Sequence, residues 1–598
     1  MVRDNVSDHG SAALTSVGLR DIAARMPGLL PDLPVILRGA VTGLRARPDT
    51  RTSIGRVFQD RAARYCDRVF LRFAGTEITY AQANATVNRY AAVLAARGAG
   101  RGDVVGIMLR NSPNAVLMML AAVKCGATAG MVNYNQQGEV LAHSLKLIDA
   151  KVLVTEADLV AAVEDSGAPT SGLVSVEELE RLAADQPTLN PASVDEVRAK
   201  DAAFYIFTSG TTGFPKASIM THRRWLRALT AFGGLGLRLH TDDTLYCALP
   251  LYHNNALTVA LSSVLNSGST LALDSSFSAS RFWERVIDAD ATAFVYIGEI
   301  CRYLLNQPPK PTDRAHRVRV ICGNGLRPEI WDEFAERFGI ERICEFYGAS
   351  EGNAAFINMF NMPRTAGMAP MPLAYVEYDP ETGDPARGPD GRVRRVPTGE
   401  PGLLISPVNK LSPFDGYTDP SATEKKLIRD AFKEGDCWFN TGDLMVSQGL
   451  GHGAFVDRLG DTFRWKGENV ATTEVEAAVS ACDAVEECAV FGVEVPRTGG
   501  RAGMAALTLR EGAEFDGREL AEVVGSRLPG YAVPLFVRVV DSMVHTSTYK
   551  SRKVELRDQA YGAEVTDPLY VLAGPQEGYV PFYPEYPDEV AAGKRPQA

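Results

Sequence analysis

The chain of 598 residues has no cysteine pair with the spacing of a metal-binding or redox motif. Its nine cysteines are odd in number and scattered, and no two of them form a CxxC. They are Cys66, Cys125, Cys247, Cys301, Cys322, Cys344, Cys437, Cys482 and Cys488. Disulfide frameworks belong mostly to short secreted chains, and structural zinc sites need closely spaced pairs. We therefore expect reduced thiols in a cytosolic protein and no structural zinc.

A long uninterrupted apolar run is also missing. Residues 1–14 carry acidic side chains and a histidine where a secretory signal would need an apolar core. The strongest candidate for a membrane span, residues 115–132, contains Lys124 and two glycines. A buried helix that runs into a turn explains this stretch better than a span does. We predict no transmembrane helix.

The charge balance lacks the positive excess of nucleic-acid-binding proteins. The chain has 62 Lys and Arg residues against 73 Asp and Glu residues, a formal net charge of −11. An acidic surface repels phosphate backbones, so anionic substrates must enter locally basic sites. The hydrophobic content of 45% and charged content of 23% are those of a globular protein. Because of this negative charge we expect no nucleic-acid partner. The length of the chain indicates at least two domains.

From residue 58 onward, helix and strand patterns alternate along the chain. A polar cap at residues 79–82 opens a helix, and residues 104–108 and 152–155 each have the apolar character of a strand. This alternation predicts an α/β fold with βαβ subdomains and parallel sheets. Loops rich in Pro and Gly at residues 379–401 interrupt the pattern before the last part of this large domain.

A second, smaller domain is predicted toward the C-terminus. A helix begins near Glu474, and residues 489–495 and 505–509 have strand patterns, so this tail is α+β. Its length fits one small domain. We therefore predict a large domain at residues 52–459 and a small, mobile α+β domain at residues 460–598.

Residues 1–51 form a separate peripheral segment. Residues 19–44 are rich in Leu, Ile, Val and Met but are interrupted by three prolines, and arginines dominate the end of the segment. The favoured interpretation is a pair of short helices packed on the domain surface. The alternative is contact with a membrane surface. Apolar periodicity alone does not separate the two.

Residues 205–216 carry the strongest chemical signal in the chain. They read Tyr-Ile-Phe-Thr-Ser-Gly-Thr-Thr-Gly-Phe-Pro-Lys, an apolar strand that breaks into hydroxyls and glycines. Glycines let the backbone fold tightly around an anion, short hydroxyls donate to it, and the lysine adds a point charge. We predict a polyphosphate site that includes Thr208, Ser209, Gly210, Thr211, Thr212, Gly213 and Lys216.

This loop allows two other interpretations. A P-loop needs Gly-Lys followed directly by Ser or Thr, whereas Pro215 precedes Lys216 and Ala217 follows it, so that interpretation fails. A glycine-rich hairpin turn without a ligand is the structural alternative.

The same segment resembles the phosphate loop of the adenylate-forming enzymes, which include acyl-CoA synthetases, luciferases and nonribosomal adenylation domains. The other motifs of that family follow in order from about residue 52 to the end of the chain. The resemblance implies that a carboxylate attacks the α-phosphate of ATP to form an acyl-adenylate. It also implies ATP, Mg²⁺ and coenzyme A as cofactor and co-substrates, with charge neutralisation and positioning as the main catalytic demands.

Two glycine motifs follow predicted strands and are candidates for the adenine site. Gly323, Asn324 and Gly325 follow residues 318–322, and the run that ends in Tyr347 and Gly348 follows residues 342–344. Glycine turns allow close backbone approach at strand ends, where open α/β sheets bind ligands. The resemblance implies that Tyr347 stacks on adenine.

The resemblance extends through residues 347–352 to a metal ligand. The family motif is Tyr-Gly-x-Thr-Glu, and here Ser350 stands in place of the threonine. The motif implies that Glu351 coordinates Mg²⁺, a hard ion that suits a carboxylate together with phosphate oxygens.

Residues 441–470 match the ribose, hinge and thiol motifs of the family. An aspartate that accepts both ribose hydroxyls is a natural bidentate solution, and Asp443 is the candidate. The resemblance implies that Arg458 also reaches the ribose and that the small domain rotates about Gly460, where glycine absorbs backbone changes. It further implies that Gly467, with Trp465 beside it, lines the coenzyme A channel after the rotation.

Residues 545–550 match the C-terminal catalytic motif weakly, because Tyr549 replaces the usual glycine. The resemblance implies that Lys550 stabilises the charge that develops between carboxylate and α-phosphate, together with Lys216 and Glu351. The chain has only fourteen lysines against forty-eight arginines, so a lysine at this position supports the match. A surface lysine is the structural alternative.

Residues 249–254 resemble the motif beside the acyl site, where His253 is either a gate or a core histidine. Residues 416–420, 457–470 and 567–570 resemble the very-long-chain acyl-CoA synthetases, also called fatty acid transport proteins. That match covers nearly all of residues 52–590.

The predicted function is ATP-dependent activation of long- or very-long-chain fatty acids to acyl-CoA, with release of AMP and pyrophosphate. One alternative is a fatty acyl-AMP ligase that loads a carrier protein, although the insertion that usually blocks free coenzyme A is not obvious here. The non-enzyme alternative is a lipid-uptake or membrane-binding protein with a vestigial site. We expect a cytoplasmic protein. Peripheral contact with the inner face of the cell membrane and assembly into a homodimer are both compatible with the sequence.

Overall fold

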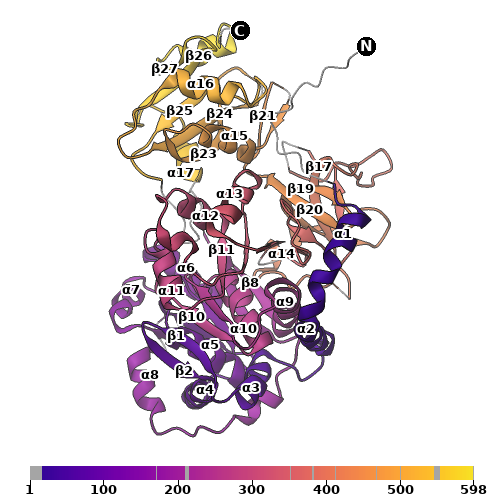
Figure 1. Ribbon diagram of the computed structural model, residues 1–598, viewed down its shortest axis with the longest axis vertical. Coiled ribbons are helices and arrows are strands. Elements are labelled where there is room, and N and C mark those ends of the chain that lie inside the picture. The colour runs from indigo at the N-terminus through magenta and orange to yellow at the C-terminus, as the bar shows by residue number, and fades with distance from the viewer. Residues whose placement is uncertain are drawn as a thin grey trace.

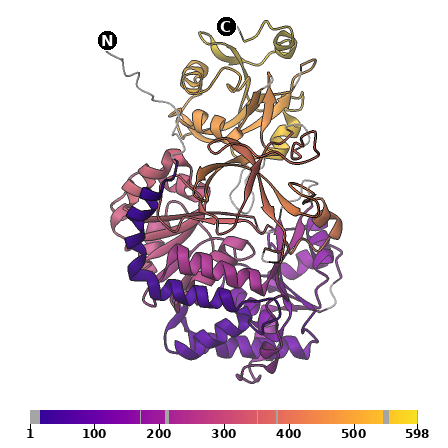
Figure 2. The same ribbon diagram turned by 90° about the vertical axis from the view of Figure 1, so that its right-hand side faces the viewer.

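The computed structural model describes most of the chain as two lobes of unequal size. The described residues are 16–169, 172–208, 214–349, 352–379, 383–410, 412–466, 468–498, 500–543 and 553–596. Residues up to the end of strand β20 (His452–Arg458) form the large body, and the residues that follow form the smaller lobe (Figures 1 and 2).

A six-stranded sheet forms one layer of the large body, in the order β6-β5-β3-β4-β7-β8 among the described residues. All its neighbours are parallel except β7 and β8, which pair antiparallel. The βαβ units and the strands predicted at residues 104–108 and 152–155 are confirmed. The strands are β3 (Val104–Met108), β4 (Thr128–Met131), β5 (Val152–Thr155), β6 (Leu173–Ser175), β7 (Ala202–Thr208) and β8 (Lys216–Thr221), and the helices beside them are α5 (Pro113–Cys125), α6 (Gly138–Ile148), α7 (Val160–Asp165) and α8 (Val176–Ala183).

A second sheet begins with a parallel half, in the order β1-β10-β9-β11-β12-β13, with β2 antiparallel at its edge. Its strands are β1 (Val69–Phe73), β2 (Thr76–Thr79), β9 (Thr244–Cys247), β10 (Thr270–Leu273), β11 (Ala293–Ile297), β12 (Val320–Asn324) and β13 (Arg342–Gly348). The helical segments of this half are α3 (Ile54–Arg64), α4 (Tyr80–Ala96), α9 (His222–Ala228), the π-helices η4 (Leu229–Leu237) and η5 (Asn255–Ala260), α10 (Leu261–Ser267), α11 (Phe282–Asp288), α12 (Gly298–Leu305) and α13 (Trp331–Phe338).

Beyond β13 the same sheet continues through antiparallel pairs only, among the described residues. The parallel arrangement predicted for the large domain therefore holds up to β13, and the antiparallel part is an addition. Its strands follow one another with little helix between them, and antiparallel neighbours need no crossover helix. They are β14 (Ala355–Ile357), β15 (Gly367–Met368), β16 (Ala374–Val376), β17 (Pro401–Pro407), β18 (Leu427–Arg429), β19 (Cys437–Gly449) and β20, with the short helix α14 (Pro420–Glu424).

The smaller lobe is α+β and has its own apolar core, centred on side chains such as Val490, Phe536 and Tyr586. The strands predicted at residues 489–495 and 505–509 lie largely within β23 and β24. The lobe contains the pair β21 (Phe463–Trp465) and β22 (Glu468–Val470), the sheet β23 (Val485–Glu494), β24 (Arg501–Leu509), β25 (Phe536–Val539), β26 (Leu569–Gly574) and β27 (Gly578–Pro581), and helices α15 (Thr472–Ser480), α16 (Gly517–Gly525), α17 (Lys553–Gln559) and α18 (Tyr586–Ala591).

Local signals explain where the long helices of the large body begin. The Thr79 hydroxyl accepts from the Gln82 amide at 3.2 Å and the Gln82 side chain accepts from the Thr79 amide at 2.8 Å, a reciprocal cap for α4. Helix α5 ends at Gly126, whose φ of +93° favours glycine, and its residues from Ala115 to Cys125 are buried. Residues 115–132 are thus a buried helix, a turn and strand β4. None of the helices in the described stretches is long and apolar enough to cross a bilayer.

The N-terminal segment lies along the side of the large body as α1 (Leu19–Arg25), the 3₁₀-helix η1 (Met26–Asp32) and α2 (Leu33–Arg45) (Figures 1 and 2). Helix α2 packs on η4 almost backbone to backbone, since a Cβ on Gly39 would lie 3.1 Å from the Cα of Gly234. The Thr230 hydroxyl donates to the Gly39 carbonyl at 2.7 Å. The favoured interpretation predicted a pair of short helices packed on the domain surface, and the structure has three short helical elements there.

Candidate active site

A cavity of about 2530 Å³ opens between the large body and the smaller lobe. It gathers most of the predicted site residues that the structure describes, although they come from strands and loops far apart in the chain. The predicted residues that line it are Thr208, Lys216, His253, Asn324, Gly325, Tyr347, Gly348, Asp443, Arg458 and Gly460. Gly323 and Trp465 are also described, but they do not line it.

Nine predicted site residues lie outside the described residues, so their roles rest on the sequence alone. They are Ser209, Gly210, Thr211, Thr212, Gly213, Ser350, Glu351, Gly467 and Lys550.

The two ends of the predicted phosphate loop meet at the cavity. Strands β7 and β8 are consecutive and antiparallel, and Thr208 lies directly opposite Lys216 in their register. The Thr208 hydroxyl donates to the Lys216 carbonyl at 3.5 Å, and the Lys216 ammonium lies 5.8 Å from the centre of the Tyr417 ring. The hairpin alternative and the phosphate role are compatible, because a hairpin brings this cation to the cavity wall.

The two predicted glycine turns begin later than the sequence pattern indicated. Strand β12 runs on through Gly323 and Asn324, so the turn starts at Gly325, whose φ is +87°. At Gly323 a Cβ would lie 2.3 Å from the Tyr296 carbonyl oxygen, so this glycine permits close packing of β12 on β11. Asn324 accepts a hydrogen bond of 2.8 Å from the Asn255 amide group.

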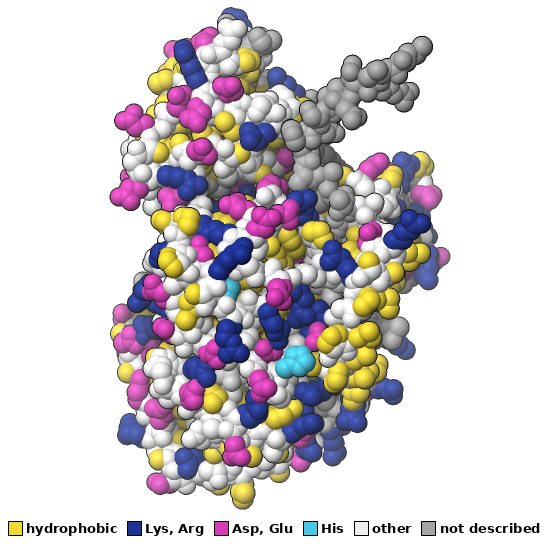
Figure 3. Space-filling view, viewed as in Figure 1, with side chains coloured by type: hydrophobic (Ala, Val, Ile, Leu, Met, Phe, Trp, Pro, Cys, Tyr) yellow, Lys and Arg dark blue, Asp and Glu magenta, His cyan; other side chains and the backbone are white. Residues whose placement is uncertain are grey.

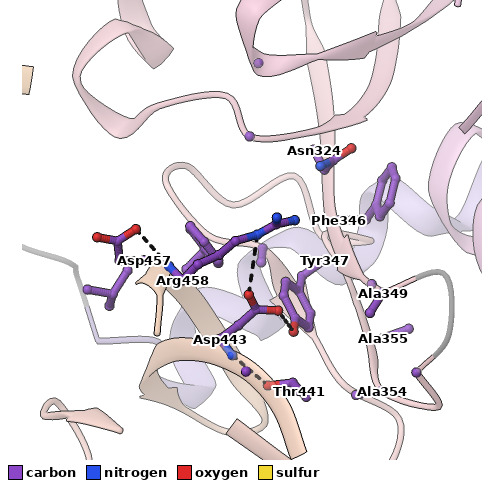
Figure 4. A pocket seen from close by; sticks show the side chains of 18 of the residues that line it. Asn324, Phe346, Tyr347, Ala349, Ala354, Ala355, Thr441, Asp443, Asp457 and Arg458 are labelled. Atoms are coloured by element: carbon purple, nitrogen blue, oxygen red, sulfur yellow. Dashed lines mark hydrogen bonds and ion pairs between the residues drawn. The ribbon is translucent and has the colours of Figure 1, made fainter. Parts of the chain in front are cut away.

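Asp443 is the centre of a polar cluster on the cavity wall (Figure 4). The Tyr347 hydroxyl donates to one carboxylate oxygen at 2.5 Å, and the Arg458 Nε lies 3.8 Å from the other. Asp443 and Arg458 face each other across β19 and β20, and the Asp443 amide donates to the Thr441 hydroxyl at 3.1 Å. A carboxylate held in this way beside a cation and an aromatic ring can accept hydrogen bonds from neighbouring hydroxyls of a ligand.

Glu345, which no sequence motif pointed to, supports the turn at Gly325. Its carboxyl group accepts from the Tyr296 hydroxyl and from the amides of Gly325 and Leu326, the last at 3.3 Å. Burial raises the pKa of Glu345 to about 8, although these three donors act in the opposite direction. An acidic residue inside the apolar run of β13 was the sequence signal for this role.

A second missed feature is a buried charged network across the two lobes. Glu476 of α15 lies 2.9 Å from Arg327 of the large body and 2.6 Å from Lys553 of α17. Burial opposes ionisation of Glu476, yet the two cations hold its pKa below the usual range. At the same junction the Thr472 amide donates to Asp457 at 2.6 Å, and burial raises the pKa of Asp457 to about 6. Isolated charged residues far apart in sequence offered no signal for this pairing.

The remaining predicted residues occupy distinct places. His253 is half-buried two residues before η5, with its ring 4.5 Å from the Tyr252 ring. Trp465 is buried in the core of the smaller lobe, where β21 pairs with β22. A Cβ on Gly460 would meet nothing within 4 Å, and its φ lies outside the left-handed region. This conformation alone therefore does not require glycine at position 460.

Within the described ranges no three His, Cys, Asp or Glu side chains are grouped to hold a metal ion. Magnesium in nucleotide sites often binds through one or two carboxylates and the phosphates of the substrate. The single predicted ligand Glu351 fits that pattern of donors.

A large α/β domain with a smaller C-terminal domain is the adenylate-forming fold, and the family models identify the family of this chain. Residues 58–405 match the AMP-binding enzyme family, and residues 474–550 match the AMP-binding enzyme C-terminal domain. The protein belongs to the AMP-binding enzyme family, which confirms the resemblance to adenylate-forming enzymes.

Individual proteins and solved structures are also similar to this chain. The chain is 72% identical over 596 residues to the medium/long-chain-fatty-acid–CoA ligase FadD6 of Mycobacterium tuberculosis, covering 99% of this chain and 100% of that protein. It is 38% identical over 591 residues to the long-chain fatty acid transport protein 2 of Rattus norvegicus, covering 93% of this chain and 94% of that protein. The fold is similar to ATP-bound MatB from Rhodopseudomonas palustris, with a TM-score of 0.72 at 24% identity over 85% of this chain and 99% of that one.

Proposed function

We propose that the protein is an ATP-dependent fatty acid–CoA ligase that activates medium- and long-chain acids through an acyl-adenylate, with release of AMP and pyrophosphate. The observation that carries the proposal is the 72% identity, over 99% of the chain, to a protein named a medium/long-chain-fatty-acid–CoA ligase. The name of that relative does not mention very long chains, so the proposal centres on shorter acids than the sequence motifs alone indicated.

The arrangement of the cavity supports a binding mode for ATP. The triphosphate would lie at the loop between Thr208 and Lys216, and the adenine between Tyr347 and the turn at Gly325. Asp443 and Arg458 would bind the ribose, since they form one cluster with the Tyr347 hydroxyl. His253 lies on the same cavity wall and would stand beside the acyl group.

Magnesium is part of this proposal. Glu351, together with phosphate oxygens, would hold the ion, which when bound neutralises charge on the triphosphate. Titration of the protein with ATP, with and without Mg²⁺, should show a gain in affinity that Glu351→Gln removes. An equal gain in the variant would argue against Glu351 as ligand.

Coenzyme A is the proposed thiol substrate. Trp465 is buried away from the cavity, so a role for the segment around Gly467 in the thiol channel requires the rotated state. Rotation about Gly460 would change the position of the whole smaller lobe.

Thioester formation with free coenzyme A, measured over acids from short to very long chains, tests the proposal. We expect ATP- and CoA-dependent product with a maximum at medium or long chains. Pyrophosphate release without a CoA-dependent thioester would instead support an acyl-AMP ligase. Absence of ATP–pyrophosphate exchange with every acid would support a lipid-binding role.

Lys550 is the proposed catalytic lysine of the first half-reaction. Lys550→Ala should abolish most adenylate formation but leave ATP binding and thioester formation from a preformed adenylate largely intact, because the charge is needed only while the adenylate forms. Lys594→Ala, at an exposed position of the same lobe, is the matched control. Wild-type adenylation rates in Lys550→Ala would contradict the assignment.

A further inference from the structure

The N-terminal segment exposes an unusual amount of apolar surface. Fourteen large apolar side chains of the described residues are exposed, and seven of them lie between residues 19 and 44. They are Leu19, Met26, Leu30, Leu33, Leu37, Val41 and Leu44, and we call them the apolar stripe. Soluble proteins rarely leave contiguous apolar surface without a partner, so this concentration needs an explanation.

The spacing of the stripe places its side chains on one face of the segment. From Leu30 to Leu44 they recur every three or four residues, the period of one helical face. The opposite face of α2 is the packed one, where Val35 and Gly39 are buried against the large body. Figure 3 shows hydrophobic side chains gathered over α1 and α2, with Lys and Arg side chains at their border. The packing that holds the segment therefore does not cover the stripe.

A basic groove of about 810 Å³ runs beside the stripe. It is lined by five arginines against two aspartates, and the stripe residues Leu37 and Val41 form part of its wall. The arginines are Arg38, Arg45, Arg51, Arg56 and Arg61, and the aspartates are Asp60 and Asp195. Both aspartates pair with Arg56. This local positive charge contrasts with the net charge of −11 of the whole chain.

Arg61 shows that the arginines of the groove influence one another. Burial is the main cause that lowers its pKa, and the nearby charge of Arg38 acts in the same direction. An anion in the groove would relieve this repulsion between guanidinium groups. Guanidinium groups bind phosphate in a planar, bidentate manner, which suits a phosphate above a lipid interface.

We propose that the apolar stripe and the basic groove together form a docking surface for an anionic lipid bilayer. The leucines enter the interfacial region while Arg45 and Arg51 contact headgroup phosphates, as expected of an amphipathic helix that lies in the plane of a membrane. The other groove arginines already have partners, since Arg56 pairs with the two aspartates and Arg38 and Arg61 donate to backbone carbonyls. The charge beside the stripe favours an anionic bilayer over an uncharged apolar partner. This inference goes beyond the proposed function, because binding to lipid requires neither ATP nor an acid.

The docking surface lies close to the candidate active site. Helix α2 packs on η4, and η4 contributes Ala231 and Phe232 to the cavity wall. A bilayer on the outer face of α2 would therefore be separated from the cavity by α2 and η4. An enzyme docked in this way would meet apolar acids where they are concentrated.

Point variants test the surface better than a deletion does. Asp32 of the segment pairs with Arg238 at 3.2 Å and with Arg342 at 3.3 Å, so removal of the segment would damage the large body. The apolar stripe is tested with the double variant Leu37→Ser, Leu44→Ser in the full chain. Its matched control is Leu182→Ser with Leu189→Ser, because these leucines are exposed elsewhere on the large body.

Binding of this double variant to phosphatidylglycerol vesicles is measured by sedimentation. We expect the Leu37/Leu44 pair to weaken vesicle binding by about tenfold or more, since insertion scales with buried apolar area. The Leu182/Leu189 pair should bind like the wild type. Thermal melting curves identify any variant that fails to fold.

The basic groove is tested with the double variant Arg45→Gln, Arg51→Gln. The double variant Arg317→Gln, Arg497→Gln, which removes the same number of charges elsewhere on the protein, is the control. Only the first pair should weaken binding to phosphatidylglycerol vesicles, and it should also flatten the salt dependence of binding. Vesicles of phosphatidylcholine alone should bind the wild type much more weakly.

Three results would overturn the proposal. One is wild-type binding to phosphatidylglycerol no stronger than to phosphatidylcholine. Another is unchanged vesicle binding by folded Leu37/Leu44 and Arg45/Arg51 variants. The third is a wild-type dimer that the Leu37/Leu44 pair converts to a monomer without loss of vesicle binding, which would assign the stripe to contact between two copies of the chain.

Discussion

Asp443 is the centre of the polar cluster at which we propose that the ribose of ATP binds. Its carboxylate contacts the Tyr347 hydroxyl and lies near Arg458, so three side chains from three strands converge on one point. Charge-assisted hydrogen bonds of a carboxylate are stronger than those of neutral groups. Loss of the charge and loss of the tyrosine hydroxyl should therefore have different effects.

Asp443→Asn should weaken ATP binding by about tenfold or more, because a hydrogen bond to a charged group contributes about 1.5–3 kcal/mol. Tyr347→Phe keeps the ring and the carboxylate, so its dissociation constant for ATP should change much less. Isothermal titration calorimetry with ATP measures both. Equal loss in the two variants would mean that the bonded Tyr347–Asp443 pair acts as a unit and that the carboxylate charge has no separate role in binding.

Glu345 makes stability depend on pH through its buried carboxyl group. Its pKa is raised from 4.5 to about 8, so its stabilising contribution is complete below pH 4.5 and is lost as the pH rises toward about 8. Glu345→Gln mimics the protonated carboxyl group. We expect the urea midpoint of the variant, relative to the wild type, to increase steadily between these two pH values.

The exposed loop residue Glu400 provides the control for this titration. Glu400→Gln should show no such pH-dependent gain over the wild type. A constant difference between Glu345→Gln and the wild type across the range would show that Glu345 is ionised in the fold.

At the scale of elements, helix α15 is joined to the large body by an ion pair as well as by hydrogen bonds from Thr472 and Thr473 to β20. Glu476 on this helix contacts Arg327, which follows the turn at Gly325, and Lys553 at the start of α17. Buried ion pairs contribute little net stability but are costly to break on one side. The network can therefore select one arrangement of the lobes without adding much to overall stability.

Arg327→Met should loosen the contact between the lobes while each lobe stays folded. Glu476 keeps Lys553 as partner, so the expected cost is about 1.5–3 kcal/mol, the range for one hydrogen bond to a charged group. Faster limited proteolysis near residues 459–462 is the readout. Arg317→Met, which breaks an exposed pair with Asp290 inside the large body, should leave the cleavage rate unchanged.

At the scale of the whole molecule, we propose that the link between the lobes decides which half-reaction the cavity can support. Gly460 has space for a side chain and an ordinary backbone conformation in this arrangement. Any need for glycine at this position must therefore come from another arrangement of the lobes.

Gly460→Ala should be tolerated, whereas Gly460→Pro should restrict rotation by locking φ near −65°. We expect the proline variant to keep adenylate formation, measured by ATP–pyrophosphate exchange, and to lose thioester formation. Equal loss of both half-reactions in a folded Gly460→Pro protein would contradict the hinge assignment.

The sequence by itself determined the order of motifs and most of the local structure. The strands at residues 104–108 and 152–155 and the cap at Thr79 followed from apolar periodicity and hydroxyl chemistry, which act between neighbours in the chain. The family was identified differently, by the resemblance of the ordered motifs to those of the adenylate-forming enzymes. That resemblance also implied that Asp443, Tyr347 and Arg458 belong to one site, although not that they are in contact.

Only the tertiary structure decided how distant residues meet. Tyr347 and Asp443 are 96 residues apart, and Arg327 and Glu476 are 149 apart, so no local pattern encodes either contact. The pKa of Glu345 depends on burial that no neighbour in sequence provides. Likewise, the apolar pattern of residues 19–44 was visible from the start, but which leucines face solvent depended on how α2 packs on η4. Burial and charge pairing are properties of the folded whole, because both are set by groups brought together from across the chain.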